Sequence, residues 1–507
     1  MSTEIHWRWE WRTFGDFFGR ADEAFAAMTP TGVQESDEQY FLSARHSPDI
    51  NIKVRFDLLD VKTLDAVNVD GLEQWHPILK ANFPIDRATA TEILKVLGIT
   101  DRVPEQDSYT LEEFTDRVAI LADLRSANVH KRRVRYVVGG CTSEVSDVDV
   151  DGIHTRTIAI ESEDPDAVRA AVESVGLKDY LNTSYGIGLL ATLADAPERY
   201  AIIDVGTNSV KFHIAERRPD GTFARVKDRA EITRIGEGMD ETGRMAQEPM
   251  ERTADAIADM VGEAKQAGVR AIAAVATAAF RIADNSDEAV ELVRTRTGVT
   301  IEPISGDDES RLAYIGAVGD ARVGEGSTLV FDTGGGSSQF TFGHGATLDE
   351  RFSVNVGAAR FTEQFGLDQA VSPDVVSEAL AAISASLPEL DSRPRPDAVV
   401  GMGGAITNMT AVSLTMPAYD PDAIHGATLD LAEIDRQIEL YRTRSADERR
   451  AIVGLQLKRA EVILAGACIV RTVLEKLGQD SLKVSDRGLR HGILIERFGI
   501  KTSERSA

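Results

Sequence analysis

The residues best placed to do chemistry in this 507-residue chain lie in the stretch Thr328–Phe342. An apolar run ends there in Asp332, three glycines follow at Gly334–Gly336, and Ser337 and Ser338 precede a second apolar alternation. The pattern predicts a strand, a tight turn and a second strand. Glycines let the backbone approach an anion closely, and successive N–H groups in such a turn form an anion-binding concavity. A carboxylate beside bound phosphate implies a divalent cation, because the negative charges would otherwise repel.

The same arrangement occurs earlier in the chain, at Tyr200–Ile214. An apolar run ends in Asp204, the polar turn Gly206–Ser209 follows, and apolar residues resume. A single stretch of this kind is also explained by an ordinary glycine-rich hairpin whose aspartate caps the turn. Two stretches with the same spacing predict a duplicated lobe, in which both turns face one cleft and hold phosphate from two sides.

Composition limits the class of protein. The length gives room for about three domains, and 43% hydrophobic and 27% charged residues are typical of a soluble globular chain. The net charge of −26 argues against a nucleic-acid binder, although local basic clusters still allow a polyanionic substrate. The start does not resemble a signal peptide, no apolar run reaches the roughly 20 residues that span a bilayer, and the only cysteines are Cys141 and Cys468. We expect a cytoplasmic protein without nucleic-acid or membrane partners.

Basic residues alternate with apolar ones along several N-terminal segments. Lys53 and Arg55 share one face of their segment, and Lys131, Arg133 and Arg135 share one face of another. A charged face on a single strand usually faces solvent. Like charges at period two on several strands predict an antiparallel barrel with a charged interior, because a bound polyanion would relieve their repulsion. These five residues are the expected anion-binding residues of the barrel.

The order of these segments resembles the CYTH, or triphosphate-tunnel, superfamily over residues 1–195. Basic strands are followed by helical segments at 88–97 and 111–121, further basic strands, and then TIAIESEDPDAV and GLKDYLNTSYGIGL. The resemblance implies an α+β domain, an antiparallel barrel whose lumen holds triphosphate, usually with metal. The family opens with Glu-x-Glu-x-Lys, where this chain has Arg8-x-Glu10-x-Arg12. Because a cation replaces one metal-binding carboxylate, the barrel is expected to bind anions rather than to carry metal-dependent chemistry.

After a joint around Pro197 the chain changes to alternating strands and helices, which indicates an α/β lobe. The hairpin at 201–214 leads to a helix at Pro249–Ala267 and a strand at Ala271–Ala276. A second lobe begins near Gly326 and repeats this plan, with the segment ERFSVNVGAARFTEQF expected to be helical. We predict domains at residues 1–195, 199–324 and 325–507.

From Ala201 onward the chain resembles the exopolyphosphatase/guanosine pentaphosphate phosphohydrolase family, within the acetate/sugar-kinase and actin superfamily. The resemblance is carried by IDVGTNSVKF, ATAAFRIADN, ISGDDESRLAYIGA, FDTGGGSSQF and four later blocks, FSVNVGAARFTEQF, GMGGAITN, IHGATLDLAEI and VSDRGLRHGIL. It implies a two-lobed, actin-like (ribonuclease H-like) α/β fold. It also implies hydrolysis of a phosphoanhydride with Mg²⁺ or another divalent cation.

The resemblance also assigns roles to single residues. Glu309, in the ISGDDESRL segment, takes the place of the catalytic base, and Arg281 takes the place of an arginine that holds terminal phosphate oxygens. Asp204 and Asp332 take the places of metal ligands. The backbone groups expected to hold phosphate are those of Gly206, Thr207, Asn208, Ser209, Gly334, Gly335, Gly336 and Ser337. Taken alone, Glu309 is also explained by the dipole of a helix N-terminus and Arg281 by a surface ion pair.

Two positions depart from the family pattern. Gln339 stands where relatives have a metal-binding glutamate, and Lys211 stands where many have arginine. An amide supplies no negative charge. The leading hypothesis is an exopolyphosphatase that removes terminal phosphate from inorganic polyphosphate, with guanosine pentaphosphate as the alternative substrate. Gln339 and Arg8 keep open a catalytically weak polyphosphate or nucleotide sensor. A sugar or acetate kinase is less favoured, and the oligomeric state is open, with a homodimer among the options.

Overall fold

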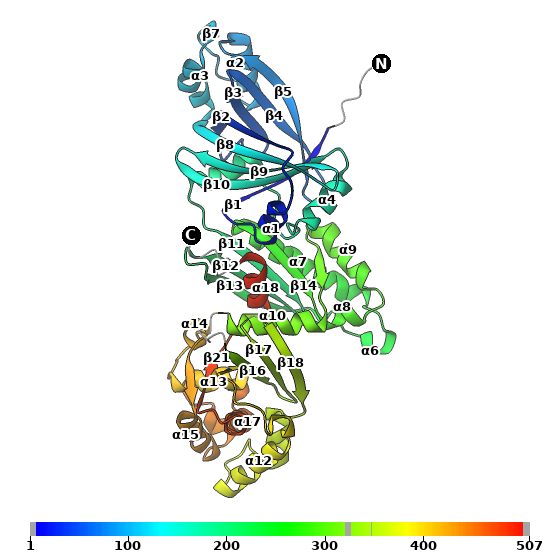
Figure 1. Ribbon diagram of the computed structural model, residues 1–507, viewed down its shortest axis with the longest axis vertical. Coiled ribbons are helices and arrows are strands. Elements are labelled where there is room, and N and C mark those ends of the chain that lie inside the picture. The colour runs from blue at the N-terminus through cyan, green and yellow to red at the C-terminus, as the bar shows by residue number, and fades with distance from the viewer. Residues whose placement is uncertain (1–6, 320–325, 346, 500–507) are drawn as a thin grey trace. The chain divides into compact units, whose positions relative to one another are not determined.

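The structure is a computed structural model that describes residues 7–319, 326–345 and 347–499, without the side chains of residues 240 and 241 (Figure 1). The chain divides into two compact units, one up to Pro303 and again from Arg497, the other Ile304–Glu496. The first unit contains a β-barrel followed by an α/β domain that we call lobe I, and the second unit is lobe II. The division into three domains remains a prediction. Within the described ranges, no helix has both the length and the apolar content needed to cross a membrane.

Eight antiparallel strands close into a barrel, which confirms the predicted barrel and is consistent with a CYTH-like domain. The order around the barrel is β1-β10-β9-β8-β2-β3-β4-β5, drawn in blue to cyan in Figure 1. The strands are β1 (Trp9–Gly15), β2 (Gly32–Leu42), β3 (Ile50–Arg55), β4 (Leu58–Val67), β5 (Glu73–Asn82), β8 (Arg125–Val138), β9 (Cys141–Val150) and β10 (Ile153–Ser162). Along β8, Lys131 is buried whereas Arg132 is exposed, as period-two alternation requires.

The predicted helical insert packs on the outside of the barrel. It consists of α2 (Arg87–Val96), α3 (Leu111–Arg117) and a short 3₁₀ turn at Ala119–Ala122, with the two-stranded ladder β6 (Ile85–Asp86) and β7 (Ser108–Tyr109). Ile93 and Phe114 join Ile52 and Val54 in one buried cluster. Ile52 and Val54 lie on the face of β3 opposite to Lys53 and Arg55. Packing against the insert therefore determines which face of β3 turns toward the inside of the barrel. The remaining barrel helices are α1 (Arg20–Ala26), α4 (Pro165–Ser174) and α5 (Tyr185–Leu193).

Lobe I is a five-stranded sheet in the order β13-β12-β11-β14-β15. Its strands are β11 (Arg199–Val205), β12 (Ser209–Arg217), β13 (Phe223–Ile232), β14 (Val269–Ala276) and β15 (Ile301–Pro303). The first three pair antiparallel, and β11, β14 and β15 pair parallel. The helices are α6 (Met239–Thr242), α7 (Gln247–Gln266), α8 (Ala278–Ile282) and α9 (Ser286–Thr297). An apolar face of α7 that includes Ile257 and Met260 packs with Ile203 and Phe212 in the core.

Lobe II repeats this plan in the order β18-β17-β16-β19-β21-β20, again with an antiparallel hairpin joined to parallel strands. Its strands are β16 (Ser327–Thr333), β17 (Ser338–His344), β18 (Thr347–Val354), β19 (Ala398–Met402), β20 (Thr428–Asp430) and β21 (Ser481–Val484). Its helices are α10 (Gly306–Val318), α11 (Ala358–Phe365), α12 (Pro373–Ala385), α13 (Gly404–Ser413), α14 (Pro421–Ile424), α15 (Leu431–Arg442), α16 (Ala446–Arg449) and α17 (Ile463–Lys476), and the chain continues into α18 (Leu489–Phe498). The shared strand order supports the duplication inferred from the two hairpins.

One element of lobe II differs from the sequence prediction. The segment 350–365 was predicted to be helical, but residues up to Val354 belong to β18, and the helix begins only at Ala358. Phe352 extends the stacking of Phe340 across the sheet, with ring centroids 5.2 Å apart. Cross-strand aromatic pairing of this kind favours the strand over the local helical tendency.

A fully buried arginine, Arg449, connects three segments of lobe II. Its guanidinium donates to the carbonyl oxygens of Leu367 (2.7 Å), Tyr441 (2.9 Å), Gln369 (3.2 Å) and Ala460 (3.3 Å). Arg449→Met would leave these carbonyls unsatisfied, so we expect lobe II to lose about 3–5 kcal/mol of unfolding free energy. Hydrogen exchange of the α17 amides under native conditions measures this loss.

The neighbouring exposed arginine provides the control for that substitution. Arg450 pairs with two surface residues, Asp447 and, at 3.3 Å, Glu461. We expect Arg450→Met to change the opening free energy of α17 by no more than about 0.5 kcal/mol. Equal protection of α17 in the Arg449→Met and Arg450→Met variants would contradict a structural role for Arg449.

Candidate active site in two lobes

The turn between β16 and β17, residues 334–337, is held by backbone hydrogen bonds within the turn and from α11. Gly334 N–H closes the turn by donating to the Ser337 carbonyl at 2.9 Å. The first N–H groups of α11, those of Ala358 and Ala359, donate to the carbonyls of Gly334 and Gly335, both at 2.9 Å. Among the described residues, the N–H groups of Gly335 and Gly336 have no acceptor. Because α11 occupies the carbonyls of Gly334 and Gly335, two of the acceptors of the turn are taken while two of its donors are not.

The turn between β11 and β12, residues 206–209, is built in the same way. Gly206 N–H donates to the Ser209 carbonyl at 3.0 Å. The Asn208 carbonyl accepts from Arg234 N–H at 3.0 Å, and the Thr207 carbonyl accepts from Gly236 N–H at 3.1 Å. Within the described part of the chain, the N–H groups of Thr207 and Asn208 have no acceptor. Both turns therefore combine a closing hydrogen bond with two N–H groups that have no acceptor among the described residues.

Neither backbone conformation nor crowding by neighbouring atoms requires glycine at the three glycine positions of the second turn. None of Gly334–Gly336 has a positive φ, so their backbone conformations admit other residues. A Cβ added at Gly335 would make ordinary contact with Ala359 at 3.6 Å, and one added at Gly336 would meet no atom within 4 Å. The protein itself leaves room for a side chain at Gly336. Glycine at such a position is expected where a ligand approaches the backbone closely.

The two predicted metal ligands occupy equivalent positions at the strand ends. Asp204 is 4% exposed and accepts from Lys211 Nζ at 3.2 Å. Asp332 is half-buried, and burial raises the pKa of its carboxyl group despite the nearby Arg459 guanidinium. In the strand register Asp204 faces Lys211, and Asp332 faces Gln339. Each lobe thus provides one carboxylate opposite a hydrogen-bond donor.

Gln339 is exposed and is hydrogen-bonded to the second turn. Its Nε2 donates to Ser337 Oγ at 2.9 Å. Because that hydroxyl accepts from the amide, its own proton remains available to a phosphate oxygen. Ser338 behaves differently, since it is fully buried and its Oγ donates to the Val356 carbonyl at 2.6 Å. Ser338 therefore fastens the hairpin to the core.

The donor set fits a magnesium ion that arrives with its substrate. Among the described residues, no three His, Cys, Asp or Glu side chains converge on a common position. Mg²⁺ commonly binds through one or two carboxylates, several waters and substrate phosphates. Asp204 and Asp332 are carboxylates of this kind, each beside a turn that presents N–H groups.

Glu309 lies in the first turn of α10, in the same unit as Asp332. Ser305 caps this helix, and its Oγ accepts from Asp308 N–H at 3.0 Å. Arg351 of β18 pairs with Asp307 and donates to the Gly306 carbonyl at 2.9 Å. These contacts fasten the start of α10 to the antiparallel hairpin of lobe II, and Glu309 is half-buried beside them.

Arg281 lies on the exposed side of α8, in the same unit as Asp204. Thr277, directly before α8, donates its N–H to the Val205 carbonyl at 3.1 Å. Val205 is the last residue of β11, so α8 starts where the first turn starts. The predicted site residues thus form two groups, Arg281 with the first turn and Glu309 with the second. The single cleft inferred from the sequence remains a prediction.

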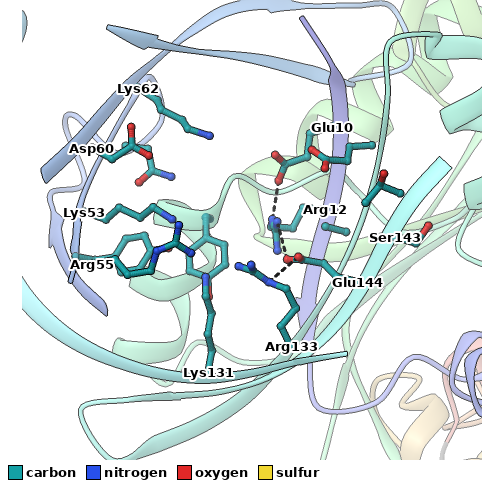
Figure 2. Close-up of a pocket in the computed structure, with 16 residues that line it drawn as sticks. Glu10, Arg12, Lys53, Arg55, Asp60, Lys62, Lys131, Arg133, Ser143 and Glu144 are labelled. Carbon is teal, nitrogen blue, oxygen red and sulfur yellow. Dashed lines mark hydrogen bonds and ion pairs between the residues drawn. The ribbon is translucent and has the colours of Figure 1, made fainter. Parts of the chain in front are cut away.

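The barrel contains a cavity of about 280 Å³, which we call the basic cavity (Figure 2). Four of the five predicted anion-binding residues line it, namely Lys53, Arg55, Lys131 and Arg133. Arg135 is not among the lining residues; it is exposed and donates to Gln34 Oε1 at 2.8 Å. The other lining residues are Glu10, Arg12, Tyr40, Asn51, Asp60, Lys62, Thr142, Ser143, Glu144, Ala159, Glu161 and Tyr185.

Two cations of the basic cavity were not predicted as ligands. Lys62 and Asp60 lie two residues apart on β4 and therefore share one face of the strand. This alternation is present in the sequence and could have identified Lys62. Arg12 stands at the lysine position of the family motif and was not predicted as a ligand. Its guanidinium lies 4.9 Å from the centre of the Tyr185 ring and donates to Glu10 at 2.8 Å. Burial and the positive charge of Lys53, opposed by the Glu38 carboxylate, lower the pKa of Lys131 to about 7. A polyanion in this cavity would restore the charge of that lysine.

Comparison with known proteins identifies the two-lobed part of the chain. The sequence model of the Ppx/GppA phosphatase family matches residues 214–499. Exopolyphosphatase 2 of Mycobacterium tuberculosis is 30% identical over 316 residues, which cover 59% of this chain and 99% of the relative. The bifunctional 3-dehydroquinate synthase/phosphatase of Fusobacterium nucleatum is 30% identical over 308 residues, 58% of this chain, and the chain spans only 46% of that protein.

A solved structure agrees with these matches. The type II crystal structure of the Aquifex aeolicus Ppx/GppA phosphatase is 33% identical, covers 59% of this chain and 99% of its own, and superposes with a TM-score of 0.55. The predicted actin-like α/β fold of the two lobes is thereby confirmed. Since the family match extends over more than half of the sequence, this chain belongs to the Ppx/GppA phosphatase family.

Proposed function

We propose that this protein is an exopolyphosphatase, a hydrolase that releases terminal phosphate from inorganic polyphosphate. The observation that carries the proposal is the pair of turns, each of which has two N–H groups without an acceptor among the described residues. Such turns suit a ligand with many anionic oxygens. A relative at 30% identity bears the name exopolyphosphatase 2.

Phosphoanhydride hydrolysis asks the protein mainly to position the substrate and to stabilise charge. The N–H groups of the two turns would hold phosphate oxygens, and Ser337 Oγ would donate to another. The Arg281 guanidinium would hold terminal phosphate oxygens through two parallel hydrogen bonds. The Glu309 carboxylate would accept the proton of the attacking water. A divalent cation held by Asp204 and Asp332 would supply neutralisation of phosphate charge.

A sensor that binds polyphosphate or a nucleotide with little turnover is the second candidate. Gln339 favours it, because an exposed amide stands where relatives place an anionic metal ligand. The carboxylates Asp204 and Asp332 and the acid Glu309 favour the enzyme. Guanosine pentaphosphate is the alternative substrate within the same reaction class.

Release of inorganic phosphate with Mg²⁺ present decides between these functions. We expect release from polyphosphate to exceed release from guanosine pentaphosphate, and EDTA to abolish both. Faster release from guanosine pentaphosphate would assign the alternative substrate. Tight binding of polyphosphate without any release would establish the sensor. Neither binding nor release of either compound would overturn the proposal.

A further inference from the structure

The segment that follows β13, residues 233–236, packs directly on the first turn. The N–H groups of its first two residues both donate to the Asn208 carbonyl, at 3.2 and 3.0 Å, and Gly236 N–H donates to the Thr207 carbonyl at 3.1 Å. A side chain at Gly236 would not fit, because an added Cβ would lie 2.4 Å from Thr207 Cγ2. The backbone of this segment is therefore held in place by the turn itself.

Arg234 in this segment has a backbone conformation that is unfavourable for arginine. Its φ is 49°, in the left-handed region that only glycine enters without strain and that asparagine and aspartate enter more readily than other residues. Apart from Phe56, the other non-glycine residues with positive φ in the described ranges carry short polar side chains. Glycine would adopt this conformation with less strain, so the presence of arginine points to a use for its side chain.

The Arg234 side chain is exposed and has no protein partner. Its neighbours Thr233 and Ile235 are both buried. Among the described residues, the Arg234 guanidinium makes no ion pair and no hydrogen bond. The nearest carboxylates along the chain on either side, those of Glu231 and Glu237, each pair with another arginine. An unpaired positive charge therefore lies next to the first turn.

The two lobes differ in the element that binds the carbonyls of their turns. In lobe II these carbonyls accept from the first N–H groups of α11, so the second turn lies at a helix N-terminus, where the helix dipole favours an anion. In lobe I the 233–236 segment takes this place and is not helical. Lys211, the cation opposite Asp204, is already paired with that carboxylate at 3.2 Å. Arg234 gives the first turn a positive charge that the second turn obtains from a helix.

We propose that Arg234 is a further substrate-binding residue, whose guanidinium holds oxygens of the phosphate group bound at the first turn. A guanidinium presents paired donors that match phosphate oxygens. The two hydrogen bonds to the Asn208 carbonyl fix the backbone from which this side chain extends. The assignment rests on the proposed function for its ligand, a phosphate chain. It adds a second arginine, beside Arg281, to the phosphate contacts of lobe I.

Steady-state phosphate release from polyphosphate with Mg²⁺ tests this assignment in the Arg234→Gly variant of the full chain. We expect KM to rise about tenfold and kcat to stay within about twofold, because a contact made equally in the ground state and the transition state affects KM alone. The thermal unfolding midpoint should not fall, since glycine accepts a positive φ. Arg234→Lys keeps the charge without the paired donors and should recover part of the loss. An unchanged KM in Arg234→Gly would overturn the proposal.

Arg218 provides a matched control in the same pair of strands. It lies between β12 and β13, at the end away from the first turn, and is exposed without a partner in the described part of the chain. Arg218→Gly removes the same charge, but it relieves no strain because the φ of Arg218 is not positive. We expect this variant to keep its KM and to show no rise in midpoint. Equal rises of KM in both glycine variants would mean that Arg234 acts only through the net charge of lobe I.

Hydrogen exchange of the first turn measures ligand binding without relying on turnover. Polyphosphate should slow exchange of the Thr207 and Asn208 amides, whose N–H groups have no acceptor among the described residues. Millisecond labelling limits the consumption of substrate during the measurement. We expect Arg234→Gly to need about tenfold more polyphosphate for the same protection. Equal concentrations in the variant and the unmodified chain, or no protection in either, would overturn the role of Arg234.

The exchange measurement separates this proposal from the proposed function. Failure of the exopolyphosphatase proposal appears as absence of phosphate release by the unmodified chain with Mg²⁺. Failure of the Arg234 proposal appears as amide protection that does not respond to Arg234→Gly. A chain that binds polyphosphate without hydrolysing it would still show whether Arg234 contacts the ligand.

Discussion

Glu309→Gln is expected to lower kcat for phosphate release from polyphosphate by about 10²- to 10⁴-fold, with little change in KM. Glutamine has nearly the shape of glutamate but cannot accept a proton from water at neutral pH. The start of α10 is fixed by Ser305 and by Arg351, so the substitution changes the chemistry of one side chain and leaves its position intact. Steady-state phosphate release with Mg²⁺ measures the effect.

A second acid in the same turn separates catalysis from helix stability. Glu309 and Asp307 both lie in the first turn of α10, where a negative charge interacts favourably with the helix dipole. Asp307→Asn removes one such charge and the exposed ion pair with Arg351, whose hydrogen bond to the Gly306 carbonyl remains. It is expected to cost stability of about the same size, within 1 kcal/mol, without the loss in kcat. Equal losses of kcat in the two variants would reduce Glu309 to a residue that stabilises the helix.

The sequence was sufficient to predict features that depend on local pattern. Alternation along β3 and β8 correctly predicted a barrel and placed Lys53 and Lys131 on one surface, and the structure puts both in the basic cavity. Alternation predicts which face of a strand carries a side chain, but it does not predict whether that side chain reaches the cavity or lies beyond its end. Arg135 shares the periodicity of Lys131 and nevertheless ends exposed beside Gln34.

Features that depend on contacts between distant segments could not be predicted. In the second turn the carbonyls of Gly334 and Gly335 accept from Ala358 and Ala359, and in the first turn the Thr207 carbonyl accepts from Gly236. All three donors lie outside the turns. The ion pairs of Glu38 could not be predicted either, because its partners Lys53 and Lys131 lie on two other strands, β3 and β8. Such roles arise only when the strand register is known.

Gly336→Ala is expected to lower kcat/KM for polyphosphate by about 10²-fold while leaving the fold intact. A methyl group at this position meets no protein atom within 4 Å, and the residue does not have a positive φ. The protein should therefore be as stable as before, or more stable by about 0.4–1 kcal/mol, because alanine restricts the unfolded chain. The methyl group would occupy the space that a phosphate oxygen needs to reach the N–H groups of the turn. Phosphate release and thermal unfolding, measured on the same sample, give both quantities.

A glycine-to-alanine substitution in α7, away from the second turn, is the control for Gly336→Ala. Gly262 lies within this helix, and an added Cβ there also meets no atom within 4 Å. Gly262→Ala should stabilise lobe I by about 1 kcal/mol through helix propensity and leave kcat/KM unchanged. If Gly336→Ala behaved like Gly262→Ala in both assays, no ligand would approach the second turn. A loss of kcat/KM confined to Gly336→Ala would show that substrate occupies the space beside Gly336. Neither the backbone conformation of this residue nor its protein neighbours require a glycine there.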